Sequence, residues 1–254
     1  MDEFLKKIIV QAGDAALEFQ TKAKVAYAKK NATDIVTEGD LLSNKIITDA
    51  IKEKHPEHVI LSEEGEHHLG EEYTWIIDPI DGTFNYSKGA PLFCVIIGLA
   101  YKKEMIMSAV YAPALNELYF AEKGKGAFLN DQKIHCGDVT DISLGFGNAF
   151  TLIGPERLSI LEKFTAEAKK HNFWLGSVGV LGVSQAWVAD GKRDWIFSSG
   201  GSIWDYAAPS LILTESGAKI SKTDGEPWIL SDDINNILAA GTTELHEYLK
   251  KMLK

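Results

Sequence analysis

Within residues 73–86, two aspartates, Asp78 and Asp81, follow a short apolar segment. Residues 75–77 have the character of a buried strand, and Asp78-Pro79, Asp81 and a Gly-Thr pair follow them. Carboxylates are almost never fully buried unless they are paired or bind a cation. Because two neighbouring carboxylates also repel each other, the spacing predicts a cation site at Asp78 and Asp81.

Three further acids stand where a predicted helix or strand begins or ends. Thr37 and Asp40 have the spacing of a capping box, Glu63 follows a short strand at 59–61, and Asp205 is the lone charge in the first turn of an apolar helix. Taken singly, each has an ordinary explanation as a cap, a solvated loop residue or a partner of the helix dipole. Together with the two strand-end carboxylates, they are the oxygen ligands that Mg²⁺ takes.

These residues fit the metal-assisted hydrolysis of a phosphate ester, in which cations polarise the phosphoryl group and acidify a water. One carboxylate can bridge two ions, and the turn at Pro79 frees a backbone carbonyl as a neutral ligand. The expected metal ligands are Glu63, Asp78, the carbonyl of Ile80, Asp81 and Asp205.

Gly82 and Thr83 open a short predicted helix whose amide groups face an anion. Glu63 and the Thr83 hydroxyl are placed to orient the attacking water, and Asp40 can accept the Thr83 proton. Lys29 or Lys30 can approach this site from the preceding loop, although a surface charge pair explains either lysine equally well.

The composition sets limits on the kind of protein. With 26 basic and 36 acidic residues, the formal net charge of −10 argues against binding to nucleic acid or to an anionic membrane. No secretory signal and no run long enough to span a membrane are visible. Cys94 and Cys136 are far apart and are expected to be reduced thiols, so a cytoplasmic location is expected. Neither common nucleotide-binding glycine motif occurs.

The remaining sequence alternates predicted helices and strands, which favours an α/β or α+β fold in layers. Helices are expected over 2–20 (prolonged by 22–28), 37–54, 155–168, 180–189, 203–216 and 243–253. Strands are expected over 59–61, 75–77, 92–101, 105–111, 117–121, 126–129, 143–150, 173–175 and 195–197, and near 219 and 237.

The sequence Asp78-Pro-Ile-Asp-Gly-Thr83 resembles the signature of the inositol monophosphatase family of Mg²⁺-dependent, lithium-sensitive phosphatases. The resemblance covers nearly the whole chain. It extends to the segments 34–40, 62–65, 124–128, 176–179, 204–205 and 215–218.

The resemblance implies a layered α-β-α-β-α sandwich, two or three Mg²⁺ ions per site and a homodimer. It implies the metal and water-activating residues already named, and a phosphate held by the amides of Gly82 and Thr83. It also places Gly179 and Ser198 at the substrate. The chain is expected to be one phosphatase domain over 1–254, with subdomains of about 1–140 and 141–254 as an alternative.

The substrate stays open, because Ser198 stands where inositol-selective members have an acid. The expected substrate is a small phosphorylated metabolite similar to inositol 1-phosphate. Alternatives within the family are fructose-1,6-bisphosphatase, 3′(2′),5′-bisphosphate nucleotidase and histidinol-phosphate phosphatase activity. A protein that binds metal or phosphorylated metabolites without turnover is the alternative from another class.

Overall fold

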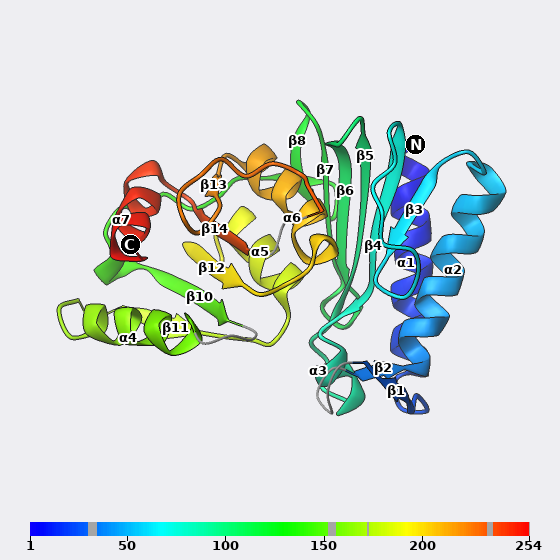
Figure 1. The fold of residues 1–254 in the computed structure, drawn as a ribbon, viewed down its shortest axis with the longest axis horizontal. Coiled ribbons are helices and arrows are strands. Elements are labelled where there is room, and N and C mark those ends of the chain that lie inside the picture. The colour runs from blue at the N-terminus through cyan, green and yellow to red at the C-terminus, as the bar shows by residue number, and fades with distance from the viewer. Residues whose placement is uncertain (30–34, 152–155, 172, 233–235, 254) are drawn as a thin grey trace.

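The structure is a computed structural model, which describes residues 1–29, 35–151, 156–171, 173–232 and 236–253. Helices and sheets alternate in five layers, in the order α-β-α-β-α (Figure 1). This is the layered sandwich predicted from the sequence. Among the described residues, no helix combines the length and the apolar character that a membrane crossing requires.

A seven-stranded sheet forms the second layer, with strand order β3-β4-β5-β6-β7-β8-β9. Strands β3 and β4 run parallel, and every other neighbouring pair is antiparallel, so the strands expected over 92–101, 105–111, 117–121 and 126–129 form a meander. Its strands are β3 (Val59–Ser62), β4 (Tyr73–Asp81), β5 (Cys94–Tyr101), β6 (Glu104–Ala112), β7 (Glu117–Glu122), β8 (Gly126–Leu129) and β9 (Gln132–Ile134), with the 3-10 turn η1 (Pro113–Leu115) between β6 and β7.

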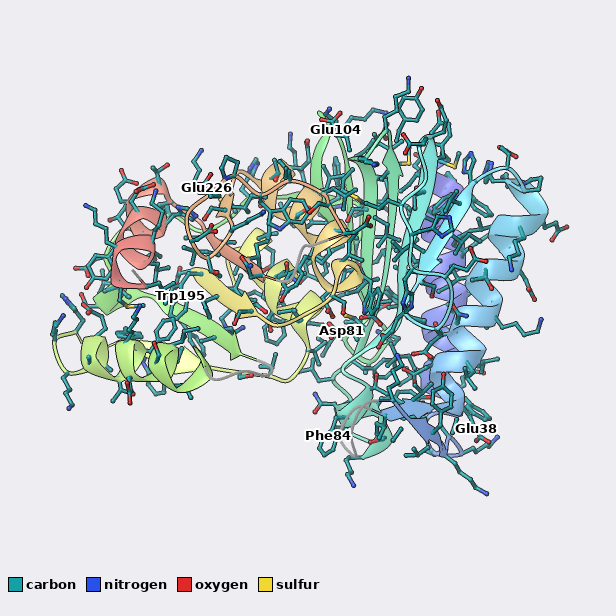
Figure 2. The ribbon with its side chains drawn as sticks, viewed as in Figure 1. Glu38, Asp81, Phe84, Glu104, Trp195 and Glu226 are labelled. Carbon is teal, nitrogen blue, oxygen red and sulfur yellow. The ribbon has the colours of Figure 1, made fainter. Side chains whose placement is uncertain are left out.

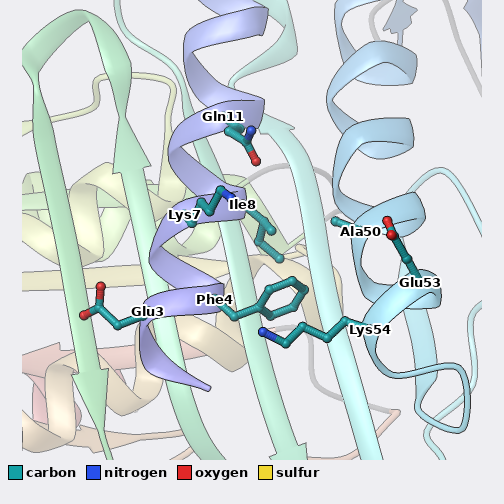
Figure 3. A pocket seen from close by; sticks show the side chains of 8 residues that line it. All are labelled: Glu3, Phe4, Lys7, Ile8, Gln11, Ala50, Glu53 and Lys54. Atoms are coloured by element: carbon teal, nitrogen blue, oxygen red, sulfur yellow. The ribbon is translucent and has the colours of Figure 1, made fainter.

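Helices α1 (Asp2–Phe19) and α2 (Glu38–Lys54) cover the outer face of this sheet (Figure 1). Apolar residues at helical spacing on α1 are buried against the sheet. The predicted capping box at Thr37 and Asp40 starts α2. A groove of about 620 Å³ lies between the two helices. Figure 3 shows the side chains that line it, which include Phe4 and Lys54. The acidic residues predicted to carry chemistry do not line it.

The middle layer consists of α5 (Leu181–Ala189) and α6 (Ile203–Ser216), which pack against each other. Both helices are buried on nearly all sides, as expected for helices without a polar face. Gly217 ends α6 in the left-handed conformation that a glycine adopts at low cost, as the sequence predicts. Because α6 also contacts β13 and β14, it joins the two sheets.

A five-stranded sheet forms the fourth layer, with strand order β11-β10-β12-β14-β13. Its strands are β10 (Phe146–Thr151), β11 (Trp174–Gly176), β12 (Trp195–Ser199), β13 (Lys219–Ser221) and β14 (Asn236–Ala240). Helices α4 (Glu156–Ala168) and α7 (Thr243–Leu253) form the fifth layer, and the 3-10 turn η2 (Ile142–Leu144) precedes β10.

Three local predictions differ from the structure. The alanine-rich segment 22–28 does not prolong α1, because β1 (Val25–Ala28) pairs with β2 (Ile35–Thr37) as an antiparallel hairpin. Strand β4 does not stop at Asp78 but continues to Asp81 through an irregularity of register. Strand β9 was not predicted. Lys30, the first residue of the segment 34–40 and the first residue of the helix expected over 155–168 lie outside the described residues.

Candidate active site

Three of the predicted ligands meet where the seven-stranded sheet faces the central helices. Asp78, Asp81 and Asp205 each offer a carboxylate oxygen, and these atoms lie within 4.8 Å of one another. Figure 2 shows Asp81 at this junction. The two strand-end acids come from β4, and Asp205 comes from the first turn of α6, where its Oδ2 accepts a 2.5 Å hydrogen bond from the amide of Ser202.

The irregular end of β4 explains how a strand presents two neighbouring carboxylates. Pro79 has no amide hydrogen to donate to the sheet, and the register shifts between Asp78 and Asp81. The amide of Ile80 donates to Oδ1 of Asp78 (3.1 Å), and the Pro79 carbonyl accepts from Ser43 (2.8 Å). The Ile80 carbonyl is left to face Thr83, whose Oγ1 lies 2.9 Å away.

Protein donors hold Asp81 at one of its oxygens. The Gly182 amide at the start of α5 donates to Oδ2 at 2.5 Å, and the Cys94 thiol donates to the same oxygen at 3.5 Å. A Cβ at position 182 would meet the Cys94 sulfur at 2.9 Å, so the close approach of α5 requires glycine there. The Leu181 amide also hydrogen-bonds the Asp81 carboxylate. One oxygen of this carboxylate lies within 4.8 Å of oxygens of Asp78 and Asp205, which suits a shared cation.

Glu63 lies beside the three aspartates and is bound by a lysine. Its backbone amide donates to the Ile77 carbonyl, which fixes its position next to β4. Lys29, from the end of the β1–β2 hairpin, places Nζ 2.8 Å from Oε1 of Glu63 and 2.7 Å from Oε1 of Glu64. Lys29 therefore approaches the site, and it binds the acid that was expected to bind metal.

The electrostatics of this cluster favour a bound cation. Burial, and then the neighbouring carboxylates, raises the pKa of Asp78 well above its usual range. Burial and the charge of Asp81 do the same to the pKa of Asp205. Burial also raises the pKa of Asp81 to about 6, and it raises the pKa of Glu63 although Lys29 opposes this. Ionising these groups together is costly unless a divalent cation joins them, and their oxygens are the ligands that such ions take.

Thr83 and Asp40 form a hydrogen-bonded pair next to the cluster. Oδ2 of Asp40 accepts from the amide and hydroxyl of Thr37 (2.8 and 2.5 Å), so Oδ1 remains for the Thr83 hydroxyl at 3.1 Å. Burial raises the pKa of Asp40 to about 6, against the lowering effect of the Thr37 contacts. A hydroxyl has one proton, so Thr83 donates either to Asp40 or to the Ile80 carbonyl at a given moment.

Two glycines bring the predicted phosphate-binding segments together. Gly82 has φ +90° and starts the short helix α3 (Thr83–Ser87), as predicted. A Cβ at position 82 would lie 2.8 Å from the Val180 side chain and 3.5 Å from the Gly179 carbonyl. The side-chain amide of Asn85 on α3 donates to the Val178 carbonyl at 3.0 Å. The segment around Gly179 therefore lies directly against the start of α3.

Ser198 lies on β12 but does not present its hydroxyl to solvent. The residue is fully buried, and its Oγ lies 3.0 Å from the hydroxyl of Tyr206 on α6. Tyr206 also accepts a hydrogen bond from the Gly201 amide (3.1 Å). Because this pairing satisfies Ser198 within the protein, its placement does not favour direct contact with a substrate.

A second group of possible ligands, His55, Glu57 and His58, does not suit a metal ion. The two imidazole rings are stacked, with centroids 4.7 Å apart and planes inclined by 11°. Nitrogen lone pairs lie in the ring plane, so nearly parallel stacked rings cannot both point at one ion. In addition, the Trp75 indole donates to Nδ1 of His58 (3.1 Å), whereas a metal-bound histidine normally donates through its second nitrogen.

Sequence reasoning missed the groups that hold the acids in place. Cys94 and Gly182 contact Asp81 from another strand and from a helix, and Tyr27 on β1 donates to Glu64 in the loop after β3 (2.9 Å). The signal for Cys94 is its position opposite Asp81 in the β4–β5 register, which depends on the irregularity at Pro79.

Comparison with known proteins gives a consistent result. A model of the inositol monophosphatase family matches residues 1–254. An inositol monophosphatase of Dictyostelium discoideum is 33% identical over 89% of this chain and 86% of its own length. A putative Nus factor SuhB of Neisseria meningitidis is 34% identical over 87% of this chain and 85% of its own length.

The solved structures that resemble this chain include the extragenic suppressor protein suhB of Bartonella henselae. It superposes with a TM-score of 0.89 at 27% identity, over 99% of this chain and 97% of that one. Both the sequence and the fold therefore match over nearly the full length. The chain belongs to the inositol monophosphatase family.

Proposed function

We propose that the protein is a Mg²⁺-dependent phosphomonoesterase that hydrolyses a small phosphorylated metabolite similar to inositol 1-phosphate. Family membership supports phosphatase activity, and the acidic cluster supports divalent metal binding. The convergence of Asp78, Asp81 and Asp205 beside the start of α3 carries the proposal. We propose that Glu63 and the Ile80 carbonyl complete the ligand set.

The bound cations would polarise the phosphoryl group, acidify a water and neutralise the leaving oxygen. The amides of Gly82 and Thr83 would hold the phosphate oxygens. Thr83 donates its proton to Asp40, so that the lone pairs of its hydroxyl can accept a proton from the attacking water. Glu63 would orient the same water. A carboxyl with a pKa near 6, such as Asp40, suits proton transfer near neutral pH.

A panel of phosphate esters assayed with Mg²⁺ tests this function. The panel comprises inositol 1-phosphate, fructose 1,6-bisphosphate, 3′-phosphoadenosine 5′-phosphate, histidinol phosphate and glycerol 2-phosphate. We expect release of phosphate that stops on chelation and returns when Mg²⁺ is restored. We also expect inhibition by Li⁺, from family membership. Full activity after chelation would contradict the proposed mechanism.

The SuhB relatives give a reason to test a role without turnover. The name Nus factor does not describe a phosphatase. For this chain, the corresponding alternative is a protein that binds metal or phosphorylated metabolites without hydrolysis. Saturable Mg²⁺ binding by calorimetry without phosphate release from any ester in the panel would favour that alternative.

We propose that the protein forms a homodimer through the edge of its five-stranded sheet. Strand β11 is the edge strand of that sheet. An exposed apolar patch, which we call the β11 patch, lies at this edge and consists of Leu144, Phe146, Trp174 and Leu175. Trp174 is 74% exposed and Leu144 78% exposed. Two copies of an edge strand related by a two-fold axis can pair antiparallel, which would cover the patch.

Light scattering after size exclusion tests the dimer. We expect twice the chain mass for the wild type and a monomer for Trp174→Glu. Ile229→Glu is the matched control, because Ile229 is 61% exposed but lies outside the β11 patch. A monomeric wild type would exclude this proposal. The cytoplasmic location and the absence of nucleic-acid partners stay predictions.

A further inference from the structure

His67 lies beside the acidic cluster without being one of its predicted ligands. The residue belongs to the exposed loop between β3 and β4. Its Nε2 lies 3.2 Å from the backbone carbonyl oxygen of Glu63, and its ring centroid lies 5.0 Å from that of Trp204. His67 therefore contacts two separate parts of the protein, the Glu63 backbone and α6.

Both contacts reach segments that carry candidate metal ligands. Glu63 is a proposed ligand, and Trp204 directly precedes Asp205 in the first turn of α6. We propose that His67 is a positioning residue that fixes the Glu63 loop against the start of α6 and so sets the geometry of the metal site. This inference rests on the proposed function, because it concerns the ligands of that site.

Lys29 and Tyr27 hold the side chains of Glu63 and Glu64 from the β1–β2 hairpin, whereas His67 links this loop to α6. The Gly65 amide donates to the Ser62 carbonyl, and the Ser62 amide donates to the Glu66 carbonyl (2.9 and 3.1 Å), which closes a tight turn at the end of β3. Beyond this turn, Glu66, His67 and His68 are exposed. Fixing an exposed loop costs conformational entropy, so a contact that holds the Glu63 backbone in place before metal binds strengthens metal binding.

The hydrogen bond to Glu63 does not depend on the charge of the imidazole. A carbonyl oxygen only accepts, so Nε2 must carry the proton in this contact. Both the neutral ring with its proton on Nε2 and the imidazolium meet this requirement. The aromatic contact with Trp204 is available to both forms as well, and it adds a second, independent restraint.

The neighbouring histidine provides a matched control. His68 is also exposed and lies in the same loop, but its Nδ1 approaches Glu66 (3.6 Å), which is not a candidate ligand. His67→Ala and His68→Ala therefore remove the same side chain from adjacent positions. Two further variants separate the restraints: His67→Phe keeps an aromatic ring next to Trp204, and His67→Asn keeps a hydrogen-bond donor.

Titration calorimetry with Mg²⁺ and hydrogen exchange of the chelated protein test the proposal. We expect His67→Ala to bind Mg²⁺ about tenfold more weakly, at the low end of the effect of residues that orient metal ligands. We expect the amides of residues 63–66 to exchange faster in this variant, and His68→Ala to match the wild type in both measurements. His67→Phe and His67→Asn should each recover part of the affinity.

Activity assays add a further distinction. At saturating Mg²⁺, His67→Ala should approach the wild-type kcat, and only the Mg²⁺ concentration for half-maximal activity should rise. If His67→Ala binds Mg²⁺ as the wild type does and its loop exchanges at the same rate, the positioning role is wrong while the proposed function stands. If the wild type binds no Mg²⁺, the metal site and the positioning role both fail.

Discussion

At the scale of single residues, the negative charge of Asp81 destabilises the fold but suits metal binding. Its carboxylate is buried among other carboxylates, which opposes folding, and the same charge is suited to a cation. We expect Asp81→Asn to lose at least about a hundredfold in kcat/KM, the upper end of what loss of a supporting residue costs. The fold should persist, because the amide keeps the volume and an oxygen that can accept from Gly182. Phosphate release and far-ultraviolet circular dichroism measure the two effects, and full activity would contradict the role of Asp81.

The raised pKa of Asp81 also predicts how stability depends on pH. Its pKa is about 6 in the folded protein, against 3.8 when unperturbed. When the pKa of an acid is higher in the folded protein than in the unfolded chain, the acid does not lower the free energy of unfolding at a pH below the unfolded pKa. The free energy of unfolding then falls as the pH rises through the folded pKa. In the chelated wild type we therefore expect Asp81 to cost on the order of 3 kcal/mol above pH 6, and little near pH 4.

Urea unfolding of chelated wild type and Asp81→Asn between pH 4 and 7 isolates this contribution. Other carboxylates titrate in both proteins, so the difference between the two reports on Asp81 together with its effect on the pKa of Asp78 and Asp205. We expect the variant to gain stability relative to the wild type as pH rises, and we expect Mg²⁺ to stabilise the wild type more than the variant. A difference that does not change with pH would show that Asp81 ionises freely in the fold.

At the scale of elements, the start of α3 depends on contact with the segment that leads into α5. Gly82→Ala combines a left-handed backbone with a Cβ 2.8 Å from the Val180 side chain. Gly89 is a matched control just beyond the same helix, because it also has positive φ (+73°) but would place a Cβ in open space. Both variants should carry the backbone cost of about 1 kcal/mol.

Only Gly82→Ala should also move α3 away from residues 179–182 and weaken phosphate binding. The measurement is the inhibition constant of inorganic phosphate in the presence of Mg²⁺, together with the thermal midpoint of each variant. We expect a higher inhibition constant for Gly82→Ala alone. Equal inhibition constants for the two variants would separate α3 from phosphate binding.

Elements with strong local signals were predictable from the sequence. The capping box at Thr37 and the glycine after α6 define helix ends through contacts within a few residues, so the sequence contains the necessary information. The hairpin strand β1 was mistaken for helix because its four residues are exposed and gain order only by pairing with β2. Such pairing depends on tertiary structure, which outweighs the helix propensity of two alanines.

The residues of the candidate site also differ in whether the local sequence predicts them. Which acids matter could be predicted, because a carboxylate at the end of an apolar element needs a special reason. The irregularity at Pro79, the thiol behind Asp81 and the ring of His67 over Trp204 could not, since each is a contact between segments distant in sequence. The burial of Ser198 against Tyr206 depends equally on how β12 and α6 pack.

At the scale of the whole molecule, two features connect the sheets. Helix α6 packs on strands β4 to β8 and also contacts β13 and β14. Tyr119 on β7 is fully buried, and its hydroxyl lies 2.7 Å from Asp190 after α5 and 2.9 Å from Glu117. Lys192 binds the same two acids. This charged network joins the first sheet to the segment before β12, so we propose that residues 1–254 form one domain.

A single domain predicts that both sheets open together. We expect Tyr119→Phe to destabilise the protein by about 2 kcal/mol, because it removes a hydrogen bond from a buried hydroxyl to a charged partner. Tyr73→Phe is the control, since Tyr73 makes ring contacts with His58 and Tyr101 and its hydroxyl makes no side-chain hydrogen bond within the described part of the chain. Native-state hydrogen exchange of the chelated protein should show the same loss of protection in β5 and β12 for Tyr119→Phe, and none for the control. If protection is lost in β12 alone, the five-stranded sheet opens without the seven-stranded sheet. The chain would then consist of two units that divide near residue 140.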